Sequence, residues 1–233
     1  DEEAQVVSWS VQVPPARQLD LQREVDLIEE IARLVGYDNF GSHLPDPVEP
    51  GGLNAEQELL RRLRSNLRAA GLQELSHLSL VASDEPTNPA QVAIGNPLLT
   101  DYGCLRTTVI PALLEAAARN LQASQAGFWG FEIGKVFAVE GQQFSEHERL
   151  CGVLAGERRQ GQWITSGQPS PLSYHEGRGL LGRAFDQLGL SLQDRRSSDD
   201  SRLHPGRSAS LILEGKVIGV FGEVHPRLAE SLD

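Results

Sequence analysis

Apolar and polar residues recur with two different periods along the chain, and the change of period outlines a protein of mixed helices and strands. Apolar residues spaced three or four positions apart predict helices at residues 23–35, 54–70, 111–122 and 174–188. Shorter apolar runs predict strands at residues 6–13, 77–82, 91–94, 128–139, 150–156, 210–213 and 217–224. Strands joined by turns and interrupted by single helices favour an α+β fold, with an antiparallel sheet flanked by helices.

Prolines and glycines crowd the stretch that follows the first helix. Five of them fall close together, at Pro45, Pro47, Pro50, Gly51 and Gly52. Because these residues break both helices and strands, we expect a linker at residues 43–52. The chain then consists of an N-terminal part, residues 1–42, and a larger part, residues 53–233.

The helix predicted at residues 54–70 has the clearest local signals. Asn54 and Gln57 form a capping box at its start. Leu60, Leu63 and Leu67 recur at helical spacing, which is typical of a helix that packs on another helix.

Three carboxylates share one face of the first predicted helix. Asp26, Glu29 and Glu30 lie at positions i, i+3 and i+4, and Asp20 precedes them by six residues. Oxygen ligands of this kind suit a hard divalent cation such as Mg²⁺. From the spacing alone, a solvated acidic face near a helix N-terminus is the simpler interpretation, because the helix dipole favours negative charge there.

Composition narrows the classes of protein. The formal net charge of −11 disfavours binding to a phosphate backbone, and no apolar run reaches the roughly 20 residues of a membrane span. We therefore expect a cytoplasmic protein with no membrane partner. The chain contains no Met and begins with Asp1, so we interpret it as a piece of a longer protein.

Other polar groups offer weaker alternatives. His204 and His225, each followed by proline, could bind zinc together with Glu223, but turn or capping roles are the simpler interpretation. Arg106 lies directly before a helix and could bind an anion there, although an N-cap at Thr108 accounts for the same residues.

Four stretches resemble, in order, the β subunit of bacterial phenylalanyl-tRNA synthetase. They read VPPARQLDLQREVDLIEEIARLVGYDNF, NPLLTDYGCLRTTVIPALLEAAARNL, FEIGKVF and GVFGEVHPRLAE. The resemblance implies a degenerate, non-catalytic class II aminoacyl-tRNA synthetase core at residues 53–233, truncated at its C-terminal end. Residues 1–42 resemble the C-terminal part of the small winged-helix-like domain that precedes this core.

The resemblance also implies roles for residues and partners. In this family, carboxylates matching Asp20, Asp26, Glu29 and Glu30 bind Mg²⁺ shared with the α subunit, although the spacing from Arg17 to Asp20 is longer here. The α subunit binds ATP and pairs with β in an α2β2 heterotetramer that charges tRNA(Phe). Leu60, Leu63 and Leu67 then either face a helix of the α subunit or bury against their own sheet.

The expected function is therefore a scaffold for the catalytic α subunit of phenylalanine-tRNA ligase. FEIGKVF resembles the strand of the second class II motif, but the Gly-rich strand ending in Glu-Arg that would hold ATP is not found, so we expect this piece alone to be inactive. Two alternatives remain: a self-contained ATP-binding synthetase-like enzyme, and a nucleic-acid-binding winged-helix module.

Overall fold

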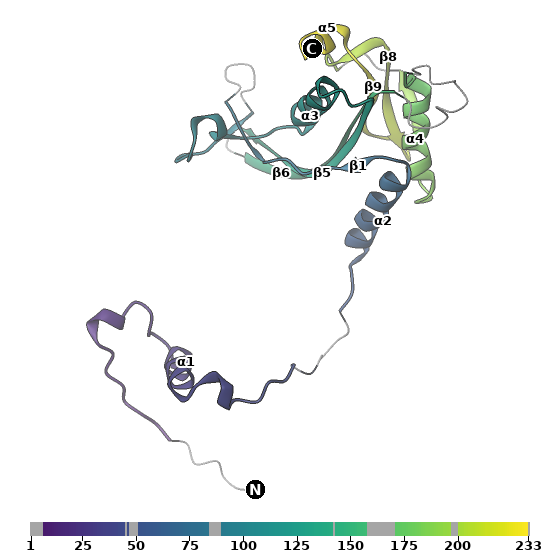
Figure 1. The fold of residues 1–233 in the computed structure, drawn as a ribbon. Coiled ribbons are helices and arrows are strands. Elements are labelled where there is room, and N and C mark those ends of the chain that lie inside the picture. Colours follow the sequence, from purple (N-terminus) through teal and green to yellow (C-terminus); the bar gives the residue numbers. More distant parts are fainter. Residues whose placement is uncertain are drawn as a thin grey trace. The chain divides into compact units, whose positions relative to one another are not determined.

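The computed structural model describes residues 7–44, 46, 51–83, 90–141, 143–157, 171–196 and 200–232. The chain divides into two compact units, Asp1–Gly52 and Leu53–Asp233 (Figure 1). Residues 45 and 47–50 of the predicted linker lie outside the described residues.

Among its described residues, the first unit contains one α-helix, α1 (Glu24–Val35), between two short 3-10 helices, η1 (Pro15–Arg17) and η2 (Tyr37–Asn39). The predicted helix is confirmed. It stops at Gly36, whose φ of +91° suits a glycine and whose N–H donates to the Ala32 carbonyl oxygen. The strand predicted at residues 6–13 was wrong, because residues 7–13 are irregular and pair with no strand among the described residues.

The main sheet of the second unit is built on one long hairpin. Strands β5 (Gly127–Glu140) and β6 (Gln143–Gly156) pair antiparallel along their whole length. The short strand β1 (Gln73–Glu74) adds to the other edge of β5 in parallel. The expectation of a purely antiparallel sheet therefore needs correction at β1, and β6 starts seven residues before the predicted 150.

Two smaller sheets complete the strands. One has the order β2 (Leu80–Val81), β4 (Cys104–Leu105), β3 (Val92–Ala93), with the 3-10 helix η3 (Thr100–Tyr102) beside it. The other has the order β7 (Gln193–Arg196), β8 (Leu203–Leu213), β9 (Lys216–Val224). The turn between β8 and β9 has positive φ at Glu214 and Gly215, as a tight hairpin requires.

Four helices accompany these sheets: α2 (Ala55–Ala69), α3 (Ile110–Gln122), α4 (Tyr174–Asp186) and α5 (Pro226–Glu230) (Figure 1). The capping box predicted at Asn54 and Gln57 is confirmed, with the Gln57 N–H donating to Asn54 Oδ1 at 2.8 Å. Helix α4 begins with an equivalent box at Ser173 and Glu176.

The core forms on both faces of β5, because successive side chains of a strand point to opposite sides. Phe128 and Val136 belong to one cluster, together with Leu113 of α3. Phe131 belongs to the other, with Leu67 of α2 and Ala184 of α4. Helices therefore cover both faces of this part of the hairpin, so the second unit is an α+β arrangement of small sheets flanked by helices.

Candidate functional site

The acidic face of α1 is the candidate suggested by the sequence, and Asp26 serves its own helix. Asp26 Oδ2 accepts hydrogen bonds from the backbone N–H groups of Arg23 (2.7 Å) and Gln22 (3.0 Å). These two backbone hydrogen bonds, first that from Gln22 and then that from Arg23, lower the pKa of the Asp26 carboxyl. Its position is thus fixed by capping at the start of α1.

Glu30 lies one turn further along and is held between two arginines. Arg17 Nη2 donates to Glu30 Oε1 at 2.6 Å, and Arg33 Nη2 donates to Oε2 at 2.6 Å. Arg17 Nε also donates to Asp20 Oδ2 at 2.7 Å. The two guanidinium groups, Arg17 first, lower the pKa of the Glu30 carboxyl, and Glu30 raises the pKa of both arginines.

Two of the four predicted metal ligands therefore converge on one positive group. Asp20 and Glu30 meet at the Arg17 guanidinium, Asp26 caps the helix, and Glu29 is exposed. Within the described ranges, no three His, Cys, Asp or Glu residues are grouped so that they could hold a metal ion. The carboxylate oxygens have the right chemistry for Mg²⁺, but the chain does not assemble all four around one point.

The three leucines of α2 that the sequence singled out differ in their surroundings. Leu67 is 1% exposed and packs with Phe131 and Ala184, and Leu63 packs against the same cluster. For these two residues the structure favours burial on the chain's own sheet, the second of the alternatives stated above. Leu60, one turn earlier, is only half-buried.

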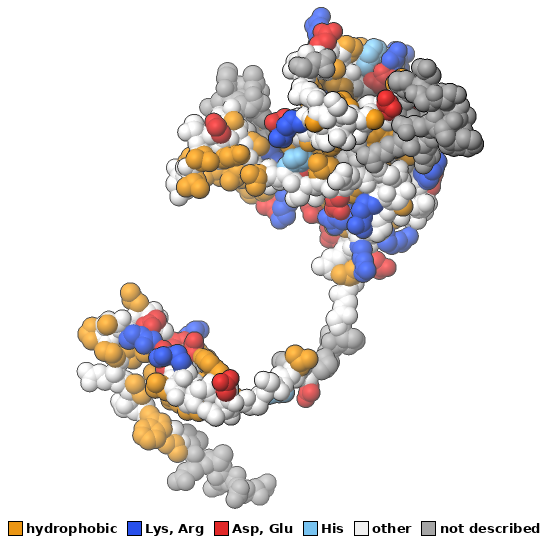
Figure 2. All heavy atoms as spheres, in the orientation of Figure 1, with side chains coloured by type: hydrophobic (Ala, Val, Ile, Leu, Met, Phe, Trp, Pro, Cys, Tyr) orange, Lys and Arg blue, Asp and Glu red, His pale blue; other side chains and the backbone are white. Residues whose placement is uncertain are grey.

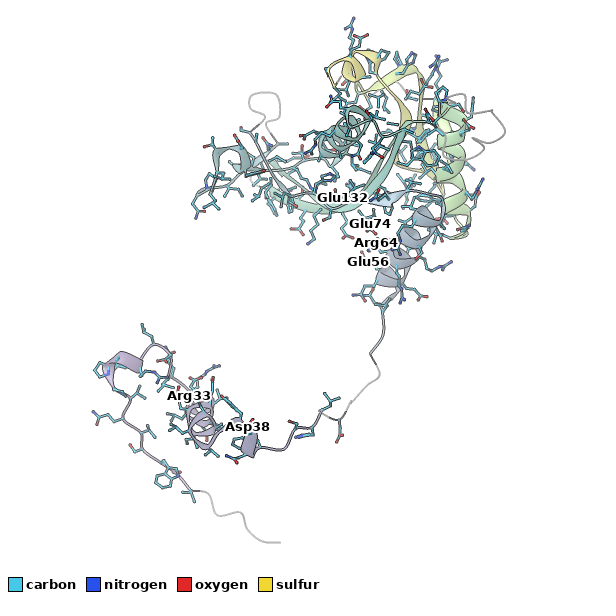
Figure 3. The ribbon with its side chains drawn as sticks, viewed as in Figure 1. Arg33, Asp38, Glu56, Arg64, Glu74 and Glu132 are labelled. Atoms are coloured by element: carbon cyan, nitrogen blue, oxygen red, sulfur yellow. The ribbon has the colours of Figure 1, made fainter. Side chains whose placement is uncertain are left out.

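A buried charged group that the sequence did not single out lies on β5. Glu132 is 3% exposed, and its Oε1 accepts from Arg106 Nη1 at 2.8 Å (Figure 3). Its Oε2 lies 2.5 Å from His77 Nδ1. Arg106 also donates through Nε to the Lys135 carbonyl oxygen at 2.9 Å. The suggestion that Arg106 binds an anion was wrong, because its guanidinium is occupied inside the core.

The signal for this group is visible in the sequence. Glu132 lies within the apolar run from 128 to 139, where a carboxylate that becomes buried requires a charged partner. The partners Arg106 and His77 are distant in sequence, so spacing alone does not reveal them.

The N-cap of α3 is Val109 and not Thr108, although Thr108 Oγ1 still accepts from the Ile110 N–H at 3.3 Å.

The histidine–proline pairs have capping and turn roles, as the simpler interpretation predicted. His225 caps α5 by accepting the Arg227 N–H at its Nδ1 (3.2 Å), and His204 Nδ1 accepts from the Gly206 N–H (3.0 Å). Glu223, the third residue of the zinc site considered above, forms an ion pair with Arg207 at 2.6 Å.

Cys151 is a partly buried free cysteine, and this burial raises the pKa of its thiol.

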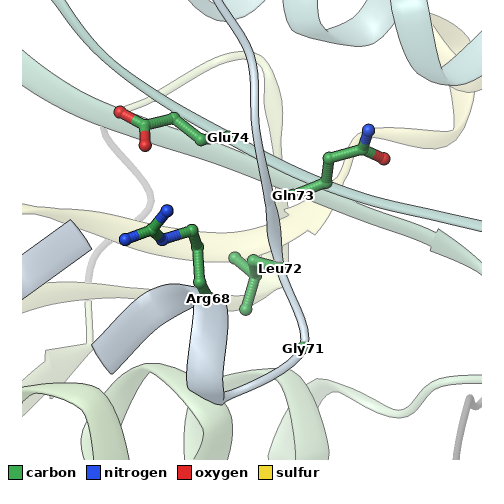
Figure 4. A pocket seen from close by; sticks show the side chains of 5 residues that line it. All are labelled: Arg68, Gly71, Leu72, Gln73 and Glu74. Carbon is green, nitrogen blue, oxygen red and sulfur yellow. The ribbon is translucent and has the colours of Figure 1, made fainter. Parts of the chain in front are cut away.

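A surface hollow at the C-terminal end of α2 is a further candidate. It is lined by Arg68, Gly71, Leu72, Gln73 and Glu74. Figure 4 shows Arg68 and Glu74 on one side of β1, with Gln73 directed away from them. Glu74 accepts from Arg64 Nε at 2.9 Å, so its charge is already paired (Figure 3).

No described helix is both long enough and apolar enough to cross a membrane.

Comparison with known proteins identifies the family to which the chain belongs. The model of the phenylalanyl tRNA synthetase beta chain CLM domain matches residues 42–233, and that of the tRNA synthetase B5 domain matches residues 2–37. The chain belongs to the phenylalanyl-tRNA synthetase β chain family. The sequence resemblance stated above is therefore confirmed.

Relatives in this family are similar along nearly the whole chain. A phenylalanine–tRNA ligase beta subunit of Synechococcus sp. (strain CC9605) is 51% identical over 225 residues, which is 97% of this chain and 28% of the relative. The corresponding subunit of Prochlorococcus marinus (strain MIT 9313) is 49% identical, again over 97% of this chain and 28% of the relative. The chain thus spans a little over a quarter of the length of these relatives.

The fold is shared with solved structures of other proteins. One of them is a pyrrolysyl tRNA synthetase, PylSc, from Desulfitobacterium hafniense, with a TM-score of 0.54 and 17% sequence identity. The match covers 76% of this chain and 62% of that one. At this identity the likeness concerns only the arrangement of helices and strands.

Proposed function

We propose that this chain is the non-catalytic core of a phenylalanine-tRNA ligase β subunit, which scaffolds a catalytic α subunit during ATP-dependent charging of tRNA(Phe). The observation that carries the proposal is the family match over residues 42–233. In this proposal, residues 53–233 form the degenerate class II core. Residues 1–42 are the end of the winged-helix-like domain.

The charges of β5 support a non-catalytic role. Synthetase chemistry on ATP needs positive groups that are free to meet phosphate oxygens. Here Arg106 forms a buried ion pair with Glu132, and Lys135 forms an ion pair with Glu146 across the β5–β6 hairpin. We therefore assign ATP binding to the α subunit, and saturable binding of ATP by this chain alone would contradict that assignment.

The acidic face of α1 supports a shared magnesium site. Asp20, Asp26, Glu29 and Glu30 supply carboxylate oxygens, and Mg²⁺ commonly takes only one or two carboxylates from one chain together with water. The α subunit would complete the ligand set in an α2β2 heterotetramer. Magnesium would supply a positive charge that links the two chains, while the chain's own residues orient the carboxylates.

Helix α2 contributes a narrower contact with the α subunit than the sequence suggested. Leu67 and Leu63 are engaged in the core cluster around Phe131. Leu60, which is half-buried, and its neighbour Leu59, which is 44% exposed, are large apolar residues of α2 that do not belong to this cluster. We keep Leu60 in the proposed interface on this basis.

Association with the α subunit tests the proposal. The chain and a separately produced α subunit would be mixed, and the mass of the complex measured by size exclusion with light scattering, with magnesium and with chelator. We expect a complex that chelator weakens, and that Glu30→Ala weakens equally. Glu24→Ala, on the same helix but outside the ligand set, is the matched control and should leave association unchanged. Absence of a complex in every condition would refute the scaffold role for this chain.

A further inference from the structure

A hollow in the second unit lies between the turn before β8 and the start of α5. The backbone joins these two segments, because the His225 N–H donates to the Arg202 carbonyl oxygen at 2.8 Å. The hollow has a volume of about 580 Å³, which leaves room for a small ligand. Its polar lining residues are Asp200, Ser201, Arg202, His225, Arg227 and Ser231.

Positive charge exceeds negative charge in this lining. Asp200 is the one carboxylate among the described lining residues, and Arg202 already pairs with both of its oxygens. Arg202 Nε donates to Oδ1 at 2.9 Å, and Nη2 donates to Oδ2 at 2.6 Å. Arg227 adds a second guanidinium; it is exposed and forms no ion pair within the described part of the chain. One positive charge is therefore left over, on a chain whose formal net charge is −11.

Hydrogen-bond donors remain available beside this charge. A guanidinium has five N–H groups and Arg202 directs two of them to Asp200, so three remain. His225 Nδ1 accepts the Arg227 N–H at 3.2 Å, so a neutral ring at this position holds its proton on Nε2, as a further donor. The lining thus combines two guanidinium groups with a neutral N–H donor, which suits an anion that has several oxygens.

We propose that this hollow binds one phosphate group, through the guanidinium groups of Arg202 and Arg227 and the Nε2–H of His225. A phosphate group offers more acceptor oxygens than a carboxylate, and the arginine fork matches its geometry. Inorganic phosphate and the backbone of a bound RNA strand present the same group, and the hollow has room for either. These contacts are all to phosphate oxygens, so ATP should have no advantage over inorganic phosphate.

Titration of the full 233-residue chain with inorganic phosphate, followed by ¹H–¹⁵N NMR, tests the proposal against sodium chloride of equal ionic strength. We expect saturable shifts of the backbone amides of Arg202, His225 and Arg227. Arg227→Gln should weaken phosphate binding about fivefold, the most that one exposed charge contact usually contributes. His225→Asn should also weaken it, because asparagine can still cap α5 but lacks the Nε2–H group.

Arg61→Gln is the matched control. Arg61 is an exposed arginine of α2 that forms no ion pair among the described residues, so the variant loses the same charge far from the hollow in sequence. Its phosphate affinity should equal that of wild type. Unchanged amide signals outside the hollow verify that each variant is folded.

The same titration with a short single-stranded RNA distinguishes the two sources of phosphate. Tighter binding of RNA that weakens steeply with salt would assign the site to an RNA backbone, and equal affinity per phosphate would assign it to the free anion. Absence of saturable shifts at the hollow with both probes would overturn the proposal. Unchanged phosphate affinity in Arg227→Gln would overturn it too, as would an equal loss in Arg61→Gln, which would reveal an effect of net charge alone.

Discussion

Replacing Glu132 by Gln should destabilise the second unit strongly, because it leaves a charge buried without its partner. The side chains of Glu132 and Arg106 are 4% and 5% exposed, and their charged atoms lie 2.8 Å apart. In Glu132→Gln the Arg106 guanidinium stays inside the core and retains its bond to the Lys135 carbonyl oxygen. Water cannot reach it to replace the lost carboxylate.

The expected loss of unfolding free energy in Glu132→Gln follows from the Arg106 charge that remains buried. Removing one member of a buried ion pair costs about 3–5 kcal/mol, whereas an exposed pair contributes about 0–1 kcal/mol. The total unfolding free energy of a domain is about 5–15 kcal/mol, so this one substitution removes a large share of it. The paired substitution Arg106→Leu with Glu132→Leu should recover part of the loss, since neither charge then remains in the core.

Urea unfolding followed by tryptophan fluorescence measures the change, because Trp129 is 4% exposed and reports on the core beside β5. The matched control is Glu74→Gln, which breaks a pair with Arg64 whose two side chains are about one-third exposed. If Glu132→Gln and Glu74→Gln lowered the unfolding free energy equally, the argument from burial would be refuted.

Three further predictions concern other elements. Leu67→Ala should lower the unfolding free energy by about 2–5 kcal/mol in urea titrations, since Leu67 is 1% exposed; a loss under about 1 kcal/mol would contradict its core role. Gly156→Ala should lower the melting temperature, because φ is +81° there and an added Cβ would overlap the Ala126 carbonyl oxygen; an unchanged melting temperature would disprove the clash. Arg17 and Arg33 lower the pKa of the Glu30 carboxyl from its ordinary value of 4.5. The contribution of ionised Glu30 to folding stability is therefore complete above pH 4.5 and is lost as the pH falls through the lowered pKa. Titration by NMR should show this pKa move up toward 4.5 in Arg17→Gln, and no movement would exclude Arg17 as its main cause.

Helices were predictable because their ends are chemically explicit. The Asn54–Gln57 box and the Gly36 stop act within a few residues, so the sequence alone predicts where α1 and α2 begin or end. Strand β6 was only half predicted, because residues 143–149 are mostly polar and pair with β5 without being buried. The two-residue strand β1 is too short to leave a pattern, and its parallel pairing depends on contacts with a strand more than fifty residues away.

The candidate site was predicted only in part, for a similar reason. The spacing of Asp26 and Glu30 correctly placed both carboxylates on α1, because helical periodicity is local. Their partners follow from tertiary geometry. The contact of Glu30 with Arg17, and that of Glu132 with Arg106, each join residues from different elements. Side-chain types at fixed intervals contain no information on such contacts.

Helix α1 differs from the other long helices in one respect that affects its dynamics. It has 12 residues, and none of them is buried; Val25, Ile28 and Leu34 are each more than half exposed, and apolar side chains are visible on the surface of this unit in Figure 2. A helix of about 12–15 residues without tertiary packing is marginal in water. Backbone amides of α1 should therefore exchange with deuterium far sooner than those of α3, which is anchored by Leu113. The acidic face is thus carried by a helix that opens often, so any surface that covers its apolar side would also fix the spacing of its carboxylates.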